Sequence, residues 1–82
     1  MNKAKENLIR RDVNISTINK WILKEGYIII INREDSLTCL GLYTPAETKN
    51  DIPQFQKYLI RGNNIRVNNY IQGMHDALNL CK

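Results

Sequence analysis

Apolar and polar positions are spaced most regularly between Ile15 and Tyr43, where the pattern predicts a helix followed by a two-stranded hairpin. At about 100° per residue, four apolar side chains of the helix fall within one face of roughly 120°: Ile15, Ile18, Trp21 and Ile22. Gly26 supplies the left-handed residue that commonly closes a helix. A β-branched run then predicts a strand from Tyr27, and a polar break of hairpin length separates it from a returning strand that ends at Tyr43.

Four consecutive isoleucines in the first strand, Ile28 to Ile31, indicate burial on both faces of the hairpin. We expect the last helix of the chain to cover one face and the central helix to cover the other. The outward face of the central helix then carries a mostly polar row: Ser16, Asn19, Lys20, Leu23 and Lys24.

The segment before the central helix is predicted to form a short helix over residues 3–11. A turn over residues 12–14 would then lead into the central helix.

Two helices are predicted after the hairpin. Thr44-Pro45-Ala46-Glu47 has the cap, proline and glutamate that mark a helix start, although residues 45–50 could form either a helical turn or a loop. Apolar spacing predicts a helix over residues 52–61, and the clearest period in the chain predicts a last helix over 66–81. The sequence therefore predicts one small α+β domain, residues 1–82, with N-terminal helices, a central antiparallel β-hairpin and two C-terminal helices packed on it.

The net charge is +4, and all of the excess lies in the first third of the chain. Up to Arg33 the chain has seven basic and three acidic residues, whereas the remainder has five basic and five acidic residues. Such a cluster indicates either a nucleic-acid contact or an ordinary solvated surface. Because a core of this size seldom supplies more than roughly 3–5 kcal/mol, a homodimer or a partner complex is expected.

The sequence has no apolar run long enough for a membrane span and no signal peptide, so we expect a cytoplasmic protein without a membrane partner. In that compartment Cys39 and Cys81 are expected to be buried thiols, and a disulfide would require an oxidising setting.

Catalytic, metal-binding and cofactor-binding patterns are missing from the sequence, so we expect a protein that is not an enzyme. His75 is the only histidine, and a lone histidine beside an apolar stripe is usually a packed residue. Trp21 could stack on nucleic-acid bases, but its place on the apolar face favours core packing.

The string from Ser16 to Ile28 resembles the recognition helix and wing entry of small winged helix-turn-helix regulators, in particular excisionase-like phage and plasmid proteins. The resemblance covers residues 15–43 and implies a regulator of transcription that binds double-stranded DNA. It places Asn19 and Lys20 at base edges, with Arg33 as the wing contact. Phosphate contacts would come from Lys24 and from Arg10 and Arg11, which precede the matched region.

Leu23 supports a different hypothesis, because an exposed apolar residue among polar neighbours often marks a protein contact. The eleven asparagines and twelve isoleucines are typical of an AT-rich genome such as many phages possess. The alternative function is therefore a phage-type inhibitor that binds a host protein complex, as anti-defence (anti-CRISPR-like) proteins do.

Overall fold

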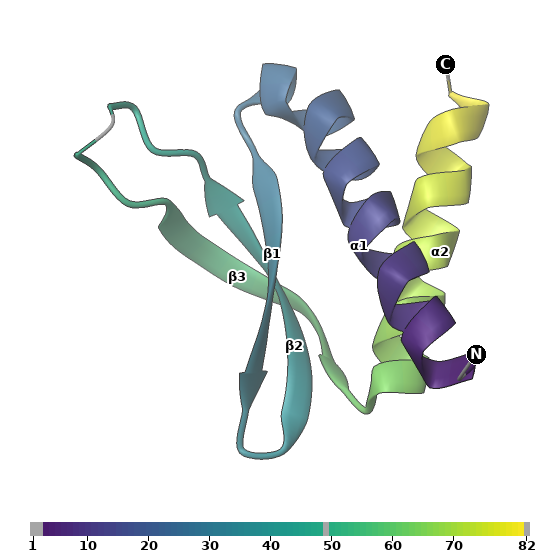
Figure 1. Cartoon of the computed structure of the whole chain (residues 1–82). Helices are drawn as coiled ribbons and strands as arrows, with labels where there is room; N and C mark the ends of the chain where they lie inside the picture. The colour runs from purple at the N-terminus through teal and green to yellow at the C-terminus, as the bar shows by residue number, and fades with distance from the viewer. Residues whose placement is uncertain (1–2, 49, 82) are drawn as a thin grey trace.

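The protein is a two-layer α+β domain, seen here in a computed structural model that describes residues 3–48 and 50–81 (Figure 1). Its elements follow in the order α1 (Lys3–Ile22), the 3-10 turn η1 (Leu23–Glu25), β1 (Ile28–Glu34), β2 (Leu37–Thr44), β3 (Gln54–Gly62) and α2 (Asn64–Leu80). The predicted α+β class and the antiparallel hairpin are confirmed. The number and arrangement of the helices differ from the prediction.

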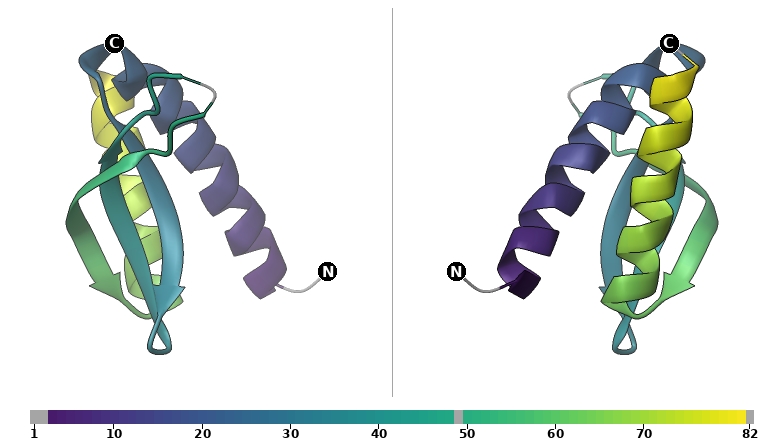
Figure 2. Two further views of the ribbon diagram at one scale, coloured as in Figure 1. Left: turned by 90° about the vertical axis from the view of Figure 1, so that its left-hand side faces the viewer. Right: turned by 90° about the vertical axis from the view of Figure 1, so that its right-hand side faces the viewer.

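The three strands form an antiparallel sheet in the order β1-β2-β3. Asp35 and Ser36 both have positive φ (48° and 67°), which is the geometry of the tight two-residue hairpin turn that joins β1 to β2. Both helices lie on one face of this sheet, and no described helix lies on the other face (Figure 2). The prediction that the central and last helices cover opposite faces is therefore wrong.

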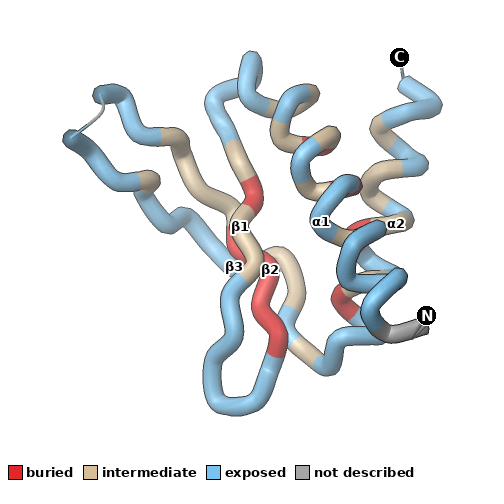
Figure 3. Tube along the Cα trace, in the orientation of Figure 1, coloured by how far each residue is buried: buried red, intermediate tan, exposed pale blue. Residues whose placement is uncertain are grey.

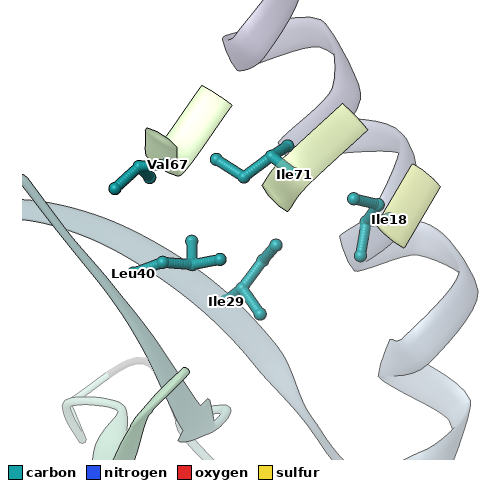
Figure 4. Close-up of a cluster of buried hydrophobic side chains, with 5 residues drawn as sticks. All are labelled: Ile18, Ile29, Leu40, Val67 and Ile71. Carbon is teal, nitrogen blue, oxygen red and sulfur yellow. The ribbon is translucent and has the colours of Figure 1, made fainter. Parts of the chain in front are cut away.

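The core lies between the helices and the sheet. Five buried side chains from four elements meet there and point toward one another (Figure 4): Ile18, Ile29, Leu40, Val67 and Ile71. The strand pairing explains this convergence, because Ile29 lies opposite Leu42 and Ile31 opposite Leu40, which places the odd-numbered positions of β1 on the helix side. The predicted burial of Ile18 is confirmed. In the predicted stripe of the last helix Val67 and Ile71 are buried and Met74 and Leu78 half-buried, whereas Tyr70, Ala77 and Cys81 are exposed.

A single helix occupies the N-terminal third of the chain, so the predicted turn over residues 12–14 is wrong. These residues continue α1 without interruption. Asn14 is 8% exposed, and its Nδ2 donates to Oε1 of Gln72 on α2 at 3.0 Å. Asparagine is a weak helix former, but the hydrogen bond to α2 satisfies the buried Asn14 side chain within α1.

Residues 52–61 do not form the predicted helix, because residues from Gln54 onward belong to β3. Phe55 lies opposite Tyr43 in the pairing of β2 with β3, and their rings contact at a centroid distance of 5.4 Å. Residues 45–48 and 50–53 form neither helix nor strand, and Lys49 lies outside the described residues. Among the described residues, the chain therefore has one C-terminal helix, which begins after the Asn63 cap.

The two helices run in the same direction and diverge toward their N-terminal ends (Figure 2). Contacts from Trp21 to His75, from Asn14 to Gln72 and from Arg11 to Asn68 mark their shared boundary. Beyond it the first turns of α1 project from the body, and residues 5–10 are exposed (Figure 3). The opening between the helices is where polar side chains gather.

Candidate nucleic-acid interface

The opening between α1 and α2 is a polar hollow of about 160 Å³, which we call the arginine groove. Two arginines, five amide side chains and one isoleucine line it: Asn7, Arg10, Arg11, Asn14, Ile65, Asn68, Asn69 and Gln72. Arginine offers a planar set of donors that suits phosphate and carboxylate groups. Asparagine and glutamine side chains both donate and accept hydrogen bonds. This lining therefore suits an anionic ligand that also has hydrogen-bond donors and acceptors.

Arg11 is the least solvated cation of the groove, with a side chain that is 14% exposed. Its Nε is buried and has no hydrogen-bond partner among the described residues. The Asp12 carboxylate lies 3.9 Å from this nitrogen but is 70% exposed, and Nη1 reaches Oδ1 of Asn68 only at 3.5 Å. Removing a charge from water is costly unless a counter-charge and hydrogen bonds replace the water. The groove therefore holds a guanidinium whose bonding capacity is incompletely used.

A chain of amide contacts holds one wall of the groove in place. Asn14 donates to Gln72, and Nε2 of Gln72 in turn donates to Oδ1 of Asp76 at 3.0 Å. Because each amide is fixed by its neighbour, the wall beside Arg11 is preorganised.

A second hollow lies on the other side of Arg11, between α1 and the hairpin end of the sheet. Its lining includes Leu8, Arg11, Asn32 and Arg33. Thr38 and Asn64 close its base through a hydrogen bond of 2.6 Å from the threonine hydroxyl. The fold thus brings Arg10, Arg11 and Arg33, three of the predicted phosphate or wing contacts, to one region of the molecule.

The N-terminal ends of both helices lie at this same end of the molecule (Figure 1). The unpaired N–H groups of a first helical turn carry partial positive charge. In α2 the Asn63 side chain accepts from one of them, the N–H of Arg66, at 2.8 Å. The helix ends and the arginines therefore favour negative charge at the same end of the molecule.

The prediction that Asn19 lies on the outward face is wrong, because its amide is bonded to the backbone of β1. Its Oδ1 accepts from the N–H of Ile29 at 2.7 Å, and its Nδ2 donates to the carbonyl of Ile29 at 3.0 Å. Because β1 is an edge strand, the outward backbone groups of Ile29 have no strand to pair with, and Asn19 takes that place.

The other predicted contacts lie in the last turn of α1 and in η1, away from the arginine groove. Lys20, Lys24 and Leu23 are exposed there. Trp21 is half-buried and packs against the ring of His75 at 5.3 Å, in agreement with the core interpretation.

The amides of the groove were missed by the sequence analysis, although a signal for them exists. Asn7, Arg11 and Asn14 share one helical face at the spacing i, i+4, i+7, and Asn68 and Gln72 repeat the spacing i, i+4. The asparagines were instead interpreted as a bias of composition.

Other candidate chemistry does not assemble in the described part of the chain. No group of histidine, cysteine or acidic side chains there could hold a metal ion, and no described helix is long and apolar enough to cross a membrane. Cys39 is buried as expected, whereas Cys81 is exposed, and both are free thiols.

Comparison with models of known families, with curated proteins and with solved structures gives no significant match.

Proposed function

We propose that this chain is a non-enzymatic nucleic-acid-binding protein, a regulator that holds the phosphate backbone of duplex DNA in the arginine groove. The observation that carries the proposal is Arg11, a mostly buried guanidinium with a buried Nε that lacks a hydrogen-bond partner. A phosphate oxygen at the guanidinium would add a charged acceptor, which the exposed Asp12 carboxylate at 3.9 Å supplies only weakly.

The surroundings of Arg11 support a polymer rather than an isolated anion. Arg10 lies in the same groove and Arg33 lines the adjoining hollow, so successive phosphates could be contacted. The amide side chains of Asn7 and Asn69 offer the paired donor and acceptor that match the edge of adenine. The projecting first half of α1 has the diameter of a helix, about 10–12 Å, which fits a major groove about 12 Å wide.

Fluorescence anisotropy on a mixed-sequence duplex tests this proposal. With three arginines at phosphates, log affinity should fall against log salt with a slope of about −3. Arg11→Met should make the slope shallower by about 1. Lys24→Met, which removes the same charge at the far end of α1, should leave the slope unchanged. Absence of binding to the duplex at low salt, or equal losses in the two variants, would overturn the proposal.

Chemical denaturation separates a lost contact from a lost fold. Methionine fills the space of the arginine stem without a buried charge, so Arg11→Met should unfold at the same or a higher urea concentration than the parent. Weaker DNA binding by a protein of equal or greater stability would assign the loss to the missing guanidinium.

A second candidate function, inhibition of a host protein complex, is supported by the far end of the molecule. Leu23 is 52% exposed there. Nearby, Ile22 and Tyr27 help line an apolar pocket of about 270 Å³ between the sheet and α2. Such a pocket could take an apolar side chain of a partner.

Variants at the far end test this second candidate. Leu23→Asp should abolish inhibition of the target and leave the circular dichroism spectrum unchanged, whereas Leu23→Met should retain inhibition. Full inhibition by Leu23→Asp would remove this site from consideration.

A further inference from the structure

The face of the sheet that no helix covers carries a cluster of aromatic and charged side chains, which we call the aromatic face: Glu34, Tyr43, Phe55, Tyr58 and Arg61. Phe55 is 48% and Tyr58 38% exposed. The isoleucine run in β1 requires cover on both sides of the sheet, yet the helices provide it on one side only (Figure 2). An exposed apolar surface of this kind commonly marks a contact with another macromolecule.

Gly41 makes room for the aromatic rings on β2. A Cβ added at this position would lie 2.8 Å from Cε1 of Tyr43 and 3.4 Å from Cε1 of Phe55. Because glycine has no side chain, the Tyr43 ring can lie over the strand, with its hydroxyl accepting from Nδ2 of Asn32 at 3.2 Å.

Tyr58 is held in the same manner from the neighbouring strand. Its hydroxyl reaches across β2 and donates to Oε2 of Glu34 at 2.7 Å. This hydrogen bond is the main reason that the pKa of Tyr58 is raised above its ordinary value. Both tyrosines are therefore fixed before any partner arrives, which lowers the entropic cost of binding.

The packing of the rings favours a protein partner over unpaired bases. The rings of Tyr43 and Phe55 meet at 71°, and those of Phe55 and Tyr58 meet at 59°. The Arg61 guanidinium also lies 4.9 Å from the centre of the Tyr58 ring. Base stacking requires free ring faces in a row, whereas a closed cluster of tyrosine, phenylalanine and arginine is typical of the centre of a protein interface.

The aromatic face carries one negative and one positive side chain, so it is electrostatically complementary to a second copy of itself. Glu34 and Arg61 both contact Tyr58, one at its hydroxyl and the other at its ring. Neither takes part in an ion pair within the described residues. In a two-fold symmetric interface, if residue i of one copy contacts residue j of the other, then residue j of the first copy also contacts residue i of the second. Arg61 of each copy could therefore meet Glu34 of the other.

We propose that the aromatic face binds a second copy of this chain in a two-fold symmetric dimer, with Arg61 of each copy paired to Glu34 of its partner. The proposal does not depend on nucleic-acid binding, because the arginine groove lies on the helix side of the sheet and stays open in such a dimer. The dimer would carry two arginine grooves related by its symmetry axis.

Charge exchange at the two positions tests the dimer. Analytical ultracentrifugation of the full chain at about 50 µM should show a dimer, because specific interfaces reach Kd values of ~1 µM or tighter. Glu34→Arg alone would place like charges opposite each other, as would Arg61→Glu alone. Each variant should dimerise at least about a hundredfold more weakly. An equimolar mixture of the two should recover the dimer, because each charge then faces its opposite.

Two further measurements make the test decisive. Phe55→Ser, at an exposed side chain, should weaken the dimer and leave the circular dichroism spectrum unchanged. The proposal would be overturned if the wild-type chain were a monomer at about 50 µM. It would also be overturned if the mixture of the two variants stayed monomeric while both were folded. A monomer whose affinity for unpaired oligonucleotides falls on Tyr58→Leu would identify a base-binding face and overturn the proposal in the same way. Failure of the dimer with intact duplex binding would leave the proposed function standing.

Discussion

The arginine groove and the aromatic face differ in how completely their polar atoms are satisfied. In the groove the buried Nε of Arg11 has no hydrogen-bond partner among the described residues. On the aromatic face both tyrosine hydroxyls already have partners, in Asn32 and Glu34. A buried guanidinium with spare bonding capacity suits an anionic group such as a phosphate of a nucleic-acid backbone. A satisfied, rigid aromatic cluster indicates a partner that matches its shape.

The largest effect is expected at Asn19, a third polar position that belongs to neither surface. Asn19→Leu should lower the free energy of unfolding by about 2–4 kcal/mol, because it leaves the N–H and carbonyl of Ile29 without their partner. Urea denaturation followed by circular dichroism measures the change. Lys20→Leu, at the exposed neighbouring position, should stay within about 0.5 kcal/mol of the parent. Equal stability of both variants would show that Asn19 has no structural role.

Gly41→Ala should damage the aromatic face and spare the groove. Overpacking against Tyr43 should cost about 1–3 kcal/mol of stability. Gly73→Ala is the matched control, because the added Cβ would meet no atom within 4 Å beyond its chain neighbours and the helix backbone, and alanine favours the helix by up to about 1 kcal/mol. A Gly41→Ala protein as stable as the parent would mean that the rings move aside without cost.

A smaller effect, confined to the groove wall, is expected at Asn14. Asn14→Ala removes the hydrogen bond to Gln72 and should cost about 1 kcal/mol. Asn69→Ala, at an exposed position of the same groove, should leave the urea midpoint unchanged. If the two variants lose equal stability, the amide contacts do not fix the wall.

The smallest effect concerns the alkaline titration of Tyr58. The hydrogen bond to Glu34 raises the pKa of this phenol, so the neutral form is favoured in the folded state. The resulting stabilisation is fully present below the unfolded pKa of about 10 and is lost as pH rises through the higher folded pKa. Absorbance titration of the parent minus Tyr58→Phe should show this late ionisation. In Glu34→Gln the pKa of Tyr58 should move back toward the ordinary value. An unchanged titration would exclude Glu34 as the cause of the raised pKa.

Local patterns were sufficient for the hairpin and the last helix, since the isoleucine run and the spacing of Val67 and Ile71 are decided by near neighbours. Residues 52–61 were misassigned because their apolar positions fit a helical period, whereas the actual strand is selected by the pairing of Phe55 with Tyr43. That contact joins residues far apart in the chain, and periodicity does not report it. The continuity of α1 depends in the same way on a contact with α2, through Asn14.

The candidate site was predictable only where charge alone identified it. Arg10, Arg11 and Arg33 were selected as basic residues of the first third, and the fold brings them together. Asn19 was assigned to the wrong surface because nothing in its own helix reveals that an edge strand will need its amide. The groove amides required knowledge that the two helices lie side by side.

The two hydrogen bonds from Asn19 to the backbone of Ile29 also restrict how copies of this chain can associate. An uncovered edge strand is a template for repeated strand addition, and the side-chain amide of Asn19 occupies the outward backbone groups of Ile29 on the β1 edge. The opposite margin, β3, is bent by two register shifts that impair regular ladder growth. With both margins blunted, self-association is steered away from open-ended fibres and toward closed pairs of finite size.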